Sequence, residues 1–302
     1  MAMNRAQFAK LLQDGLNTVW GMEYDSYPEE FRQIFKMDSS SKAYEEDQLV
    51  TGFDVAVVKP EGSAVTFAEA IQAWTSRYTH ITVALAFQIT EEAIEDNLYM
   101  AMGSKYTRAL AESMQHAKEV NAISVLNNGY SASFLGGDGV ALASASHPLA
   151  GGGTASNILA TPADLSEAAI EDILIQIRRA KNDRGLPIAL KATSVVIPPD
   201  LMFVANRILR SQGRVGTADN DINAIKSMGI FGAEPMVMTR LTDTNGWWIK
   251  TNAQNGLRGF QRKPIATKMD TEFGSGNYRY KARERYAFGF SDWRGMFGSQ
   301  GV

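Results

Sequence analysis

Residues 90–128 read TEEAIEDNLYMAMGSKYTRALAESMQHAKEVNAISVLNN, and this stretch decides the fold. Its apolar side chains recur every three or four residues, which is the spacing of one apolar stripe on a helix. Thr90 is a suitable N-cap, acidic residues fill the first turns, and no proline interrupts the run. The stripe consists of Ile94, Leu98, Ala101, Met102, Tyr106, Ala109, Leu110, Met114, Ala117 and Val120. At about 1.5 Å per residue the helix is roughly 50 Å long, so we expect a spine across a flat or elongated molecule.

The composition sets broad limits on the class of protein. The chain has 302 residues, of which 45% are hydrophobic and 21% charged, as in an ordinary folded protein. Its net charge of −3 gives no overall nucleic-acid signature, and the lack of cysteine excludes disulfides and cysteine metal sites. No apolar run reaches the length of a membrane span, and Arg5, Lys10 and Asp14 interrupt the first apolar segment. We therefore expect neither a secretory signal nor a membrane partner.

The chain before the long helix divides into a helix, an arm and a ribbon. Residues 5–20 have helical spacing, whereas residues 21–47 are polar, acidic and dotted with aromatic side chains. Such a segment cannot form a core alone, so we expect an extended arm that docks on its own subunit or on another molecule. Strand patterns at residues 49–57 and 81–89 then face each other across an insertion that begins with a turn at Pro60.

The tip between these two strands is rich in apolar side chains. A two-stranded ribbon is marginally stable by itself, and exposed apolar residues at its tip indicate that a partner covers them. Together with residues of the last strand, they are our candidates for contacts between subunits. The candidates are Phe67, Ile71, Trp74, Arg77 and Tyr78 at the tip, and Arg283 and Arg285 near the C-terminus.

The chain after the long helix begins with glycine-rich loops and continues as an α/β lobe. Helix and strand patterns alternate between residues 164 and 250, which predicts a compact lobe, and Asp164 and Glu167 have the spacing of a capping box. Residues 278–290 place aromatic side chains on one strand face and four cations on the other, with Glu284 interrupting the apolar face. Acids predominate in the first part of the chain and bases in the last, so these regions either attract each other between copies or lie on two solvated faces.

No catalytic or ligand-binding constellation is present in the sequence. There is no phosphate-binding loop, and the calcium-like residues 219–223 lack the glycine and the final glutamate that such a site requires. His80, His116 and His147 are far apart, and a structural hydrogen bond is the default role for His147. Ser39 and Lys42 have the Ser-x-x-Lys spacing of some serine hydrolases, but they lie in a serine-rich linker, which argues against a catalytic role. We predict no catalytic residue, no cofactor and no metal, and hence no enzyme.

The order of these parts resembles the major capsid protein of tailed bacteriophages, which has the Hong Kong 97-type fold. Several stretches are similar to that family in their text, and together they span nearly the whole chain. They are YEEDQLVTGF (44–53), WTSRYTHITVALAFQITEEAIEDNLY (74–99), SASHPLAGGGTASN (144–157), IPPDLMFVANRILRSQGRVGTADNDINAIK (197–226) and YKARERYAFGFSDWRGMFGS (280–299).

The resemblance implies an α+β fold with named parts. Residues 1–47 would be the N-arm, and residues 48–89 the extended β-hairpin loop, or E-loop. Residues 90–128 would be the spine helix of the P domain. Residues 129–253 would be mostly the A domain, and residues 254–302 would return to the P domain.

The resemblance also implies a structural role. The protein would assemble with itself, as hexamers and pentamers, into the icosahedral head of a phage or prophage. The head would enclose double-stranded DNA, which the protein would contact without reading its sequence. The shell would form in the bacterial host cytoplasm and belong to the virion, with portal and scaffold or decoration proteins as further partners.

Other functions stay open at this point. An encapsulin-like compartment shell has a similar fold but encloses a cargo enzyme. A ligand-binding or hydrolytic protein would use the loops at residues 141–157 and the α/β lobe. A nucleic-acid-binding protein would use the basic face of residues 279–285.

Overall fold

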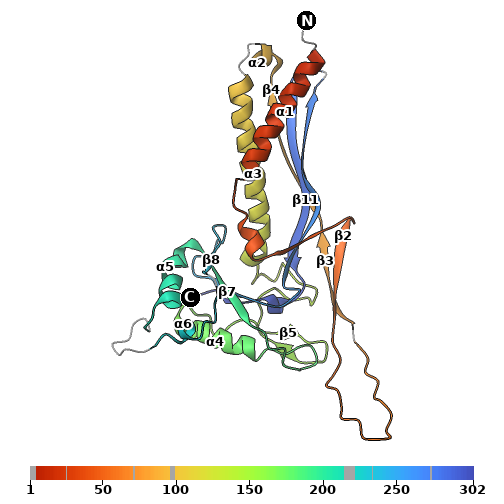
Figure 1. Cartoon of the computed structure of the whole chain (residues 1–302), viewed down its shortest axis with the longest axis vertical. Helices are drawn as coiled ribbons and strands as arrows, with labels where there is room; N and C mark the ends of the chain where they lie inside the picture. Colours follow the sequence, from red (N-terminus) through yellow and green to blue (C-terminus); the bar gives the residue numbers. More distant parts are fainter. Residues whose placement is uncertain are drawn as a thin grey trace.

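The computed structural model describes residues 5–24, 26–70, 72–95, 99–213, 222–232, 234–272 and 274–302. The molecule is elongated (Figure 1). Two long helices and a long sheet form a tall part, and an α/β lobe lies at one end of it. A loop projects from the same end, on the side away from the lobe's helices.

The long helix predicted from residues 90–128 is confirmed over most of its length. It consists of α3 (Tyr99–Asn127), preceded by the short α2 (Glu91–Glu95), and residues 96–98 lie outside the described part. The side chains of the first four predicted stripe residues, Ile94 to Met102, also lie outside it.

The buried band of α3 is wider than the predicted stripe. Most of its buried residues are pairs of neighbours in the sequence, one pair in each turn. Tyr106 and Val120 of the predicted stripe are exposed. The helix is covered from two sides, by the sheet and by the N-terminal segment, so one turn buries more positions than a one-sided helix does. The band is Thr107, Leu110, Ala111, Met114, Gln115, Lys118, Glu119, Ala122, Ile123 and Leu126.

The N-terminal segment packs on its own chain. Helix α1 (Arg5–Tyr24) lies along α3, which confirms the predicted first helix and extends it by a turn. The 3-10 turn η1 (Glu30–Gln33) and strand β1 (Lys36–Ser39) follow. The rings of Phe31 and Phe35 are buried edge-on against Phe288. The aromatic side chains of this part of the arm therefore dock on their own subunit.

The long sheet has the order β1-β10-β11-β4. Strands β10 (Leu257–Thr271), β11 (Tyr278–Phe290) and β4 (Ile81–Ile89) are antiparallel, and β1 joins β10 in parallel. Alternate residues of β11 are buried under the helices and exposed on the other side, as its pattern predicts. We call the uncovered side the open sheet face. It carries Lys281, Arg283 and Arg285 on β11 and Thr82, Ala84 and Ala86 on β4.

The predicted pairing of the ribbon is wrong. Strand β2 (Tyr44–Val50) pairs with β3 (Gln72–Thr79), whereas β4 pairs with β11. The sequence QAWTSRYT is itself a good strand former, and the chain leaves one sheet for the other at the buried His80. Residues 51–59 form no strand, because a strand requires a partner and this chain offers none there. The turn at Pro60 is present, with the Ser63 amide bonded to the Pro60 carbonyl at 3.2 Å.

The predicted α/β lobe is confirmed. Its sheet has the order β12-β9-β7-β8 and is packed against three helices. Ser166, not Asp164, caps the first helix by accepting a hydrogen bond from the Ala169 amide. The elements are β5 (His147–Pro148), β6 (Thr154–Ala155), α4 (Glu167–Arg178), β7 (Ala192–Ile197), η2 (Pro199–Leu201), α5 (Met202–Arg210), α6 (Ala224–Ser227), β8 (Met236–Val237), β9 (Trp247–Thr251), η3 (Trp293–Gly295) and β12 (Met296–Ser299).

The C-terminal end lies in the lobe rather than in the tall part. Strand β12 pairs with β9, and Trp293 and Phe297 belong to the lobe's core. Residues 254–302 are thus divided between the long sheet, through β10 and β11, and the sheet of the lobe, through β12. Met296 and Phe297 are buried apolar side chains that find their core in the lobe.

A buried ion pair joins the spine helix to the sheet. Lys118 Nζ lies 3.4 Å from a carboxylate oxygen of Glu284 and 3.9 Å from one of Glu29. The Lys118 and Glu284 side chains are 3% and 0% exposed, and the Lys118 ammonium also lies 5.6 Å from the centre of the Phe31 ring. Burial raises the pKa of the Glu284 carboxyl, and Lys118 opposes that rise. The glutamate that interrupts the apolar strand face is thus the partner of a lysine on the spine helix.

We expect Lys118→Met to lower the free energy of unfolding of the subunit by about 3–5 kcal/mol, because Glu284 then stays buried without its partner. Lys118→Met combined with Glu284→Leu should recover most of that loss, since no buried charge is left unpaired. Urea unfolding of both variants measures the difference. A double variant no more stable than the single one would contradict a role for the pair.

Candidate assembly surfaces

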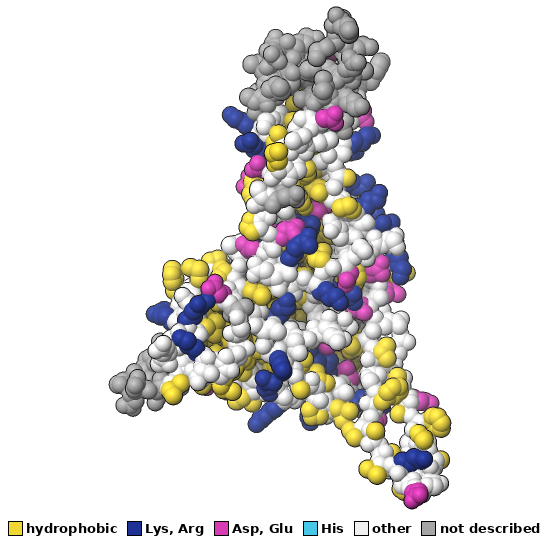
Figure 2. Space-filling view, in the orientation of Figure 1, with side chains coloured by type: hydrophobic (Ala, Val, Ile, Leu, Met, Phe, Trp, Pro, Cys, Tyr) yellow, Lys and Arg dark blue, Asp and Glu magenta, His cyan; other side chains and the backbone are white. Residues whose placement is uncertain are grey.

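The most exposed apolar segment of the described chain is the loop between β2 and β3. Figure 2 shows its hydrophobic side chains on the projection at the lower right. Phe67 is 94% exposed and Val58 is 93% exposed. The exposed apolar side chains of residues 51–70, which we call the projecting loop, are Phe53, Val55, Val57, Val58, Val65 and Phe67. Monomeric proteins rarely leave such a continuous apolar segment in water, so this loop is a candidate contact surface.

Arg184 anchors the base of the projecting loop to the lobe. Its guanidinium donates to the Asp54 carboxylate at 2.9 Å and to the Glu69 carbonyl oxygen at 2.5 Å, so it holds both ends of the loop. The turn that carries Arg184 is itself fixed, because Asn182 accepts hydrogen bonds from the Arg184 and Leu186 amides. Sequence reasoning missed Arg184, since its two partners lie more than 100 residues away along the chain.

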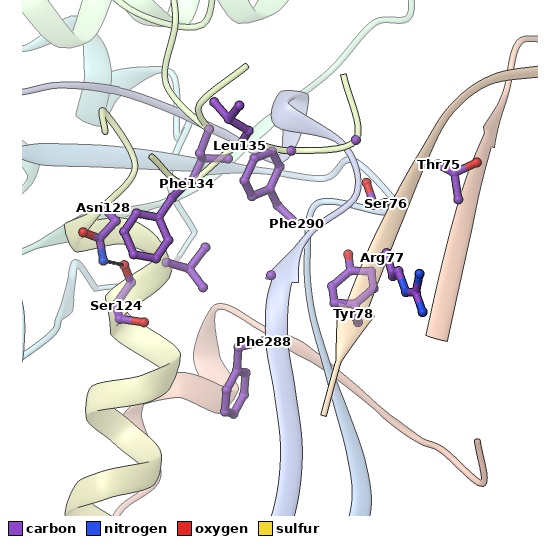
Figure 3. Close-up of a pocket in the computed structure, with 15 residues that line it drawn as sticks. Thr75, Ser76, Arg77, Tyr78, Ser124, Asn128, Phe134, Leu135, Phe288 and Phe290 are labelled. Atoms are coloured by element: carbon purple, nitrogen blue, oxygen red, sulfur yellow. Dashed lines mark hydrogen bonds between the residues drawn. The ribbon is translucent and has the colours of Figure 1, made fainter. Parts of the chain in front are cut away.

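A pocket of about 440 Å³ opens beside the root of the ribbon (Figure 3). Residues 75–78 of β3 form one wall, and the ends of α3 and β11 and the loop at residues 134–137 form the others. The rim is apolar, because Phe134 and Leu135 are each 55% exposed. A Cβ atom on Gly137 would lie 2.7 Å from the Ser76 hydroxyl, so only glycine allows the loop to press against β3 there.

The structure separates the candidate contacts of the ribbon. Phe67 lies in the projecting loop, two residues before Glu69 at its base, Trp74 is half-buried, and Ile71 lies outside the described residues. Arg77 is largely exposed, with its guanidinium 3.7 Å from the centre of the Tyr44 ring.

Tyr78 is a correction. Its side chain is 4% exposed, packs against the Phe260 ring and bonds the Ser291 hydroxyl through its own hydroxyl. The strand alternation turns Tyr78 inward and Arg77 outward. Tyr78 is therefore part of the subunit's own core and has no side-chain surface to offer a neighbour.

Arg283 and Arg285 lie on the open sheet face, at matching registers with Ala84 and Thr82 of β4. Arg283 is exposed and Arg285 is half-buried. Within the described residues, neither of these arginines forms an ion pair, and Lys281 forms none either. Burial and the charge of Arg285 lower the pKa of His80 nearby. The face is thus a row of cations that no acid of the described residues pairs with.

The acids of the arm, by contrast, are paired within the chain. Arg258 donates to Asp38 at 2.8 Å and to Asp47 at 2.6 Å. Glu30 accepts from the Thr239 amide at 2.9 Å and lies 3.5 Å from Arg240. These acids of the arm therefore meet bases of their own subunit.

Two polar clusters resemble enzyme sites in composition but not in geometry. The Ser40 hydroxyl donates to Glu45 at 2.8 Å, so His80 Nε2, 2.9 Å away, must donate to the Ser40 oxygen. A nucleophilic serine needs the reverse, a histidine that accepts the serine proton. His147 is fully buried between Asp138 and Asn157, at 2.7 and 3.2 Å, which fits the expected structural role.

The described residues contain neither a cluster of metal-ligating side chains nor a membrane-spanning helix. No group of three or more metal-ligating side chains comes together among them. Residues 219–221 of the calcium-like sequence lie outside the described part. Within the part of the chain that the structure describes, no helix has the length and apolar character needed to cross a bilayer.

Comparison with solved structures defines the class of the fold. The chain is similar to the capsid of Myoviridae phage XM1, with a TM-score of 0.55 and 14% identity over 91% of this chain and 92% of that one. It is similar to the procapsid protein of bacteriophage JBD30, with a TM-score of 0.53 and 15% identity over 98% and 76% of the two chains. A virus-like particle from Pyrococcus furiosus gives a TM-score of 0.52 and 11% identity over 95% and 98%. The fold is the Hong Kong 97-type capsid fold.

The family follows from a match at the level of sequence. The model of the family described as "Phage capsid protein" matches residues 73–298. The chain belongs to this family and is a structural subunit of a capsid shell. No match was found among curated proteins.

We expect Arg184→Ala to release the projecting loop, because one guanidinium holds both ends of it, at Asp54 and Glu69. Limited proteolysis should cut within residues 51–70 several times faster than in the unaltered protein, while the unfolding midpoint changes little. Arg178→Ala is the matched control, since Arg178 is an exposed arginine of the same lobe without an ion pair among the described residues. Equal cleavage rates in all three proteins would contradict the anchor.

Proposed function

We propose that this protein is the major shell subunit of a tailed-phage or prophage head. Copies assemble as hexamers and pentamers into an icosahedral shell in the host cytoplasm, and the shell becomes part of the virion around double-stranded DNA. The observation that carries the proposal is the projecting loop. This subunit exposes a long segment with many apolar side chains. A stable shell requires large contacts between copies, and such a segment can provide one.

The parts of the fold take distinct roles in this proposal. Residues 1–47 are the N-arm and residues 48–89 the E-loop, which reaches over an adjacent subunit. The P domain combines the spine helix of residues 90–128 with β10 and β11, and the A domain comprises residues 129–253 together with β12. The pairing of β12 with β9 supports this change at the C-terminus.

The role is structural rather than catalytic, and its partners are other proteins and DNA. Portal and scaffold or decoration proteins are the expected companions of such a shell. The unpaired cations of the open sheet face fit a phosphate backbone, which is bound through charge and not through base sequence.

A compartment shell that encloses a cargo enzyme is the second candidate. The fold correspondence with the virus-like particle from Pyrococcus furiosus covers nearly all of both chains and is the observation behind this candidate, whereas the family match is to phage capsid proteins and supports the first. The contents of purified particles separate the two, because a phage head holds nuclease-protected DNA and a compartment holds protein cargo.

We expect replacement of residues 55–68 by a short Gly-Ser turn to abolish shell formation and leave the subunit folded. The replacement keeps β2, β3 and the Asp54–Arg184 contact, which hold the base of the loop. Negative-stain microscopy and sedimentation measure assembly, and urea unfolding measures folding. Normal shells from the shortened protein would refute the assignment of the loop as a contact.

We expect Lys281→Glu with Arg283→Glu to reduce the nuclease-protected DNA in particles while subunit stability stays unchanged, because both side chains are exposed and unpaired. Lys191→Glu with Arg178→Glu, on the lobe, makes the same change in charge and serves as the control. DNA content equal to that of the unaltered protein would contradict contact with DNA. Loss of assembly in the first variant alone would assign the face to contacts between copies.

A further inference from the structure

The structure contains an exposed apolar projection and an open pocket whose wall combines polar side chains with aromatic rings. The projection is Phe67, which is the most exposed aromatic side chain among the described residues. The pocket is the one beside the root of the ribbon, with Phe134 and Leu135 at its rim and Phe288 and Phe290 further in (Figure 3). We propose that Phe67 of one copy inserts into this pocket of a second copy. The inference rests on the proposed assembly and names the site that receives the loop.

Size and chemistry fit this occupant. A volume of about 440 Å³ lies in the range of sites that hold a small ligand, so it accommodates a phenyl ring and part of the neighbouring chain. Aromatic side chains that enter apolar pockets are the usual anchors of protein interfaces. The pocket offers ring edges and faces to such an anchor through Phe134, Phe288 and Phe290.

Charge also fits. Glu69 follows Phe67 by two residues and forms no side-chain ion pair within the described residues. Arg77 belongs to the lining of the pocket, its side chain is 57% exposed, and its ion-pair partner within the described residues, Glu46, lies 4.0 Å away at the outer limit of such a contact. Two residues of extended chain span roughly 7 Å, so an inserted Phe67 brings the Glu69 carboxylate within reach of Arg77.

The chain's own Phe67 does not reach the pocket. Arg184 fixes the loop at Asp54 and Glu69, and from there the loop runs away from the tall part (Figure 1). Projection and pocket are therefore different surfaces of one subunit. A contact between two different surfaces, repeated about an axis, closes a ring, which is the geometry of a pentamer or a hexamer.

The test is cross-linking between copies in assembled particles. The chain has no cysteine, so introduced thiols give no background. Thr66→Cys and Ser133→Cys lie next to Phe67 and Phe134 and leave both apolar groups intact. The two variants, with different tags, are assembled together and treated with a short bismaleimide. We expect a cross-linked dimer that carries both tags, whereas Thr66→Cys with Ala84→Cys, on the open sheet face, should give none.

Each other result overturns the inference. A dimer with Ala84→Cys alone would place the loop on the open sheet face. Intact shells without the Thr66–Ser133 dimer would reject the pocket and leave the proposed function standing, whereas failure of the unaltered protein to assemble would reject both. As a second measurement, Phe67→Asp should weaken association of subunits about thirtyfold or more, and Phe67→Leu should largely preserve it. Equal association of both variants would likewise reject the pocket.

Discussion

The structure depends on the burial of the spine helix from two sides at once. The sheet covers one side of α3, and the N-terminal segment, with α1 and η1, covers the other. At the meeting point of these elements lies the Lys118–Glu284 ion pair, with Glu29 and the Phe31 ring of the arm against the same ammonium group. Burying a single charge costs several kcal/mol, so each member of this cluster requires the others. Helix, strand and arm are therefore held in one relative position.

This arrangement explains how charge is distributed over the molecule. The acids of the arm are drawn to bases of the same chain, above all Arg258 and Arg240, and this pairing fixes the arm beside the spine. The bases of the open sheet face have no such partners among the described residues. The overall net charge is slightly negative, yet one face is left strongly positive. Total charge is therefore a poor guide to what this protein contacts, because it averages paired acids with unpaired bases.

The same division applies to apolar surface. Three large clusters of buried apolar side chains form the cores of the lobe, of the centre of the molecule and of the far end of the tall part. The projecting loop and the rim of the pocket at Phe134 and Leu135 stay exposed. A subunit that completes its structure only in a shell is expected to divide its surface in this way. Arg184 contributes to this division by fixing the base of the projecting loop to the lobe.

The sequence by itself determined the elements whose pattern is local. These elements are the helix α3 with its 3.6-residue period, the strand β11 with its two alternating faces, and the helices and strands of the lobe. Each depends on residues that lie close together in the sequence, and the structure confirms them. The family resemblance also rested on sequence alone. Only the tertiary structure decided which strands pair. Several segments have similar strand propensity, and the choice between β3 and β4 as the partner of β2 depends on contacts far apart in the chain. For the same reason it decided that Tyr78 is core, that Arg184 anchors the loop, and that Glu284 has a buried lysine as its partner.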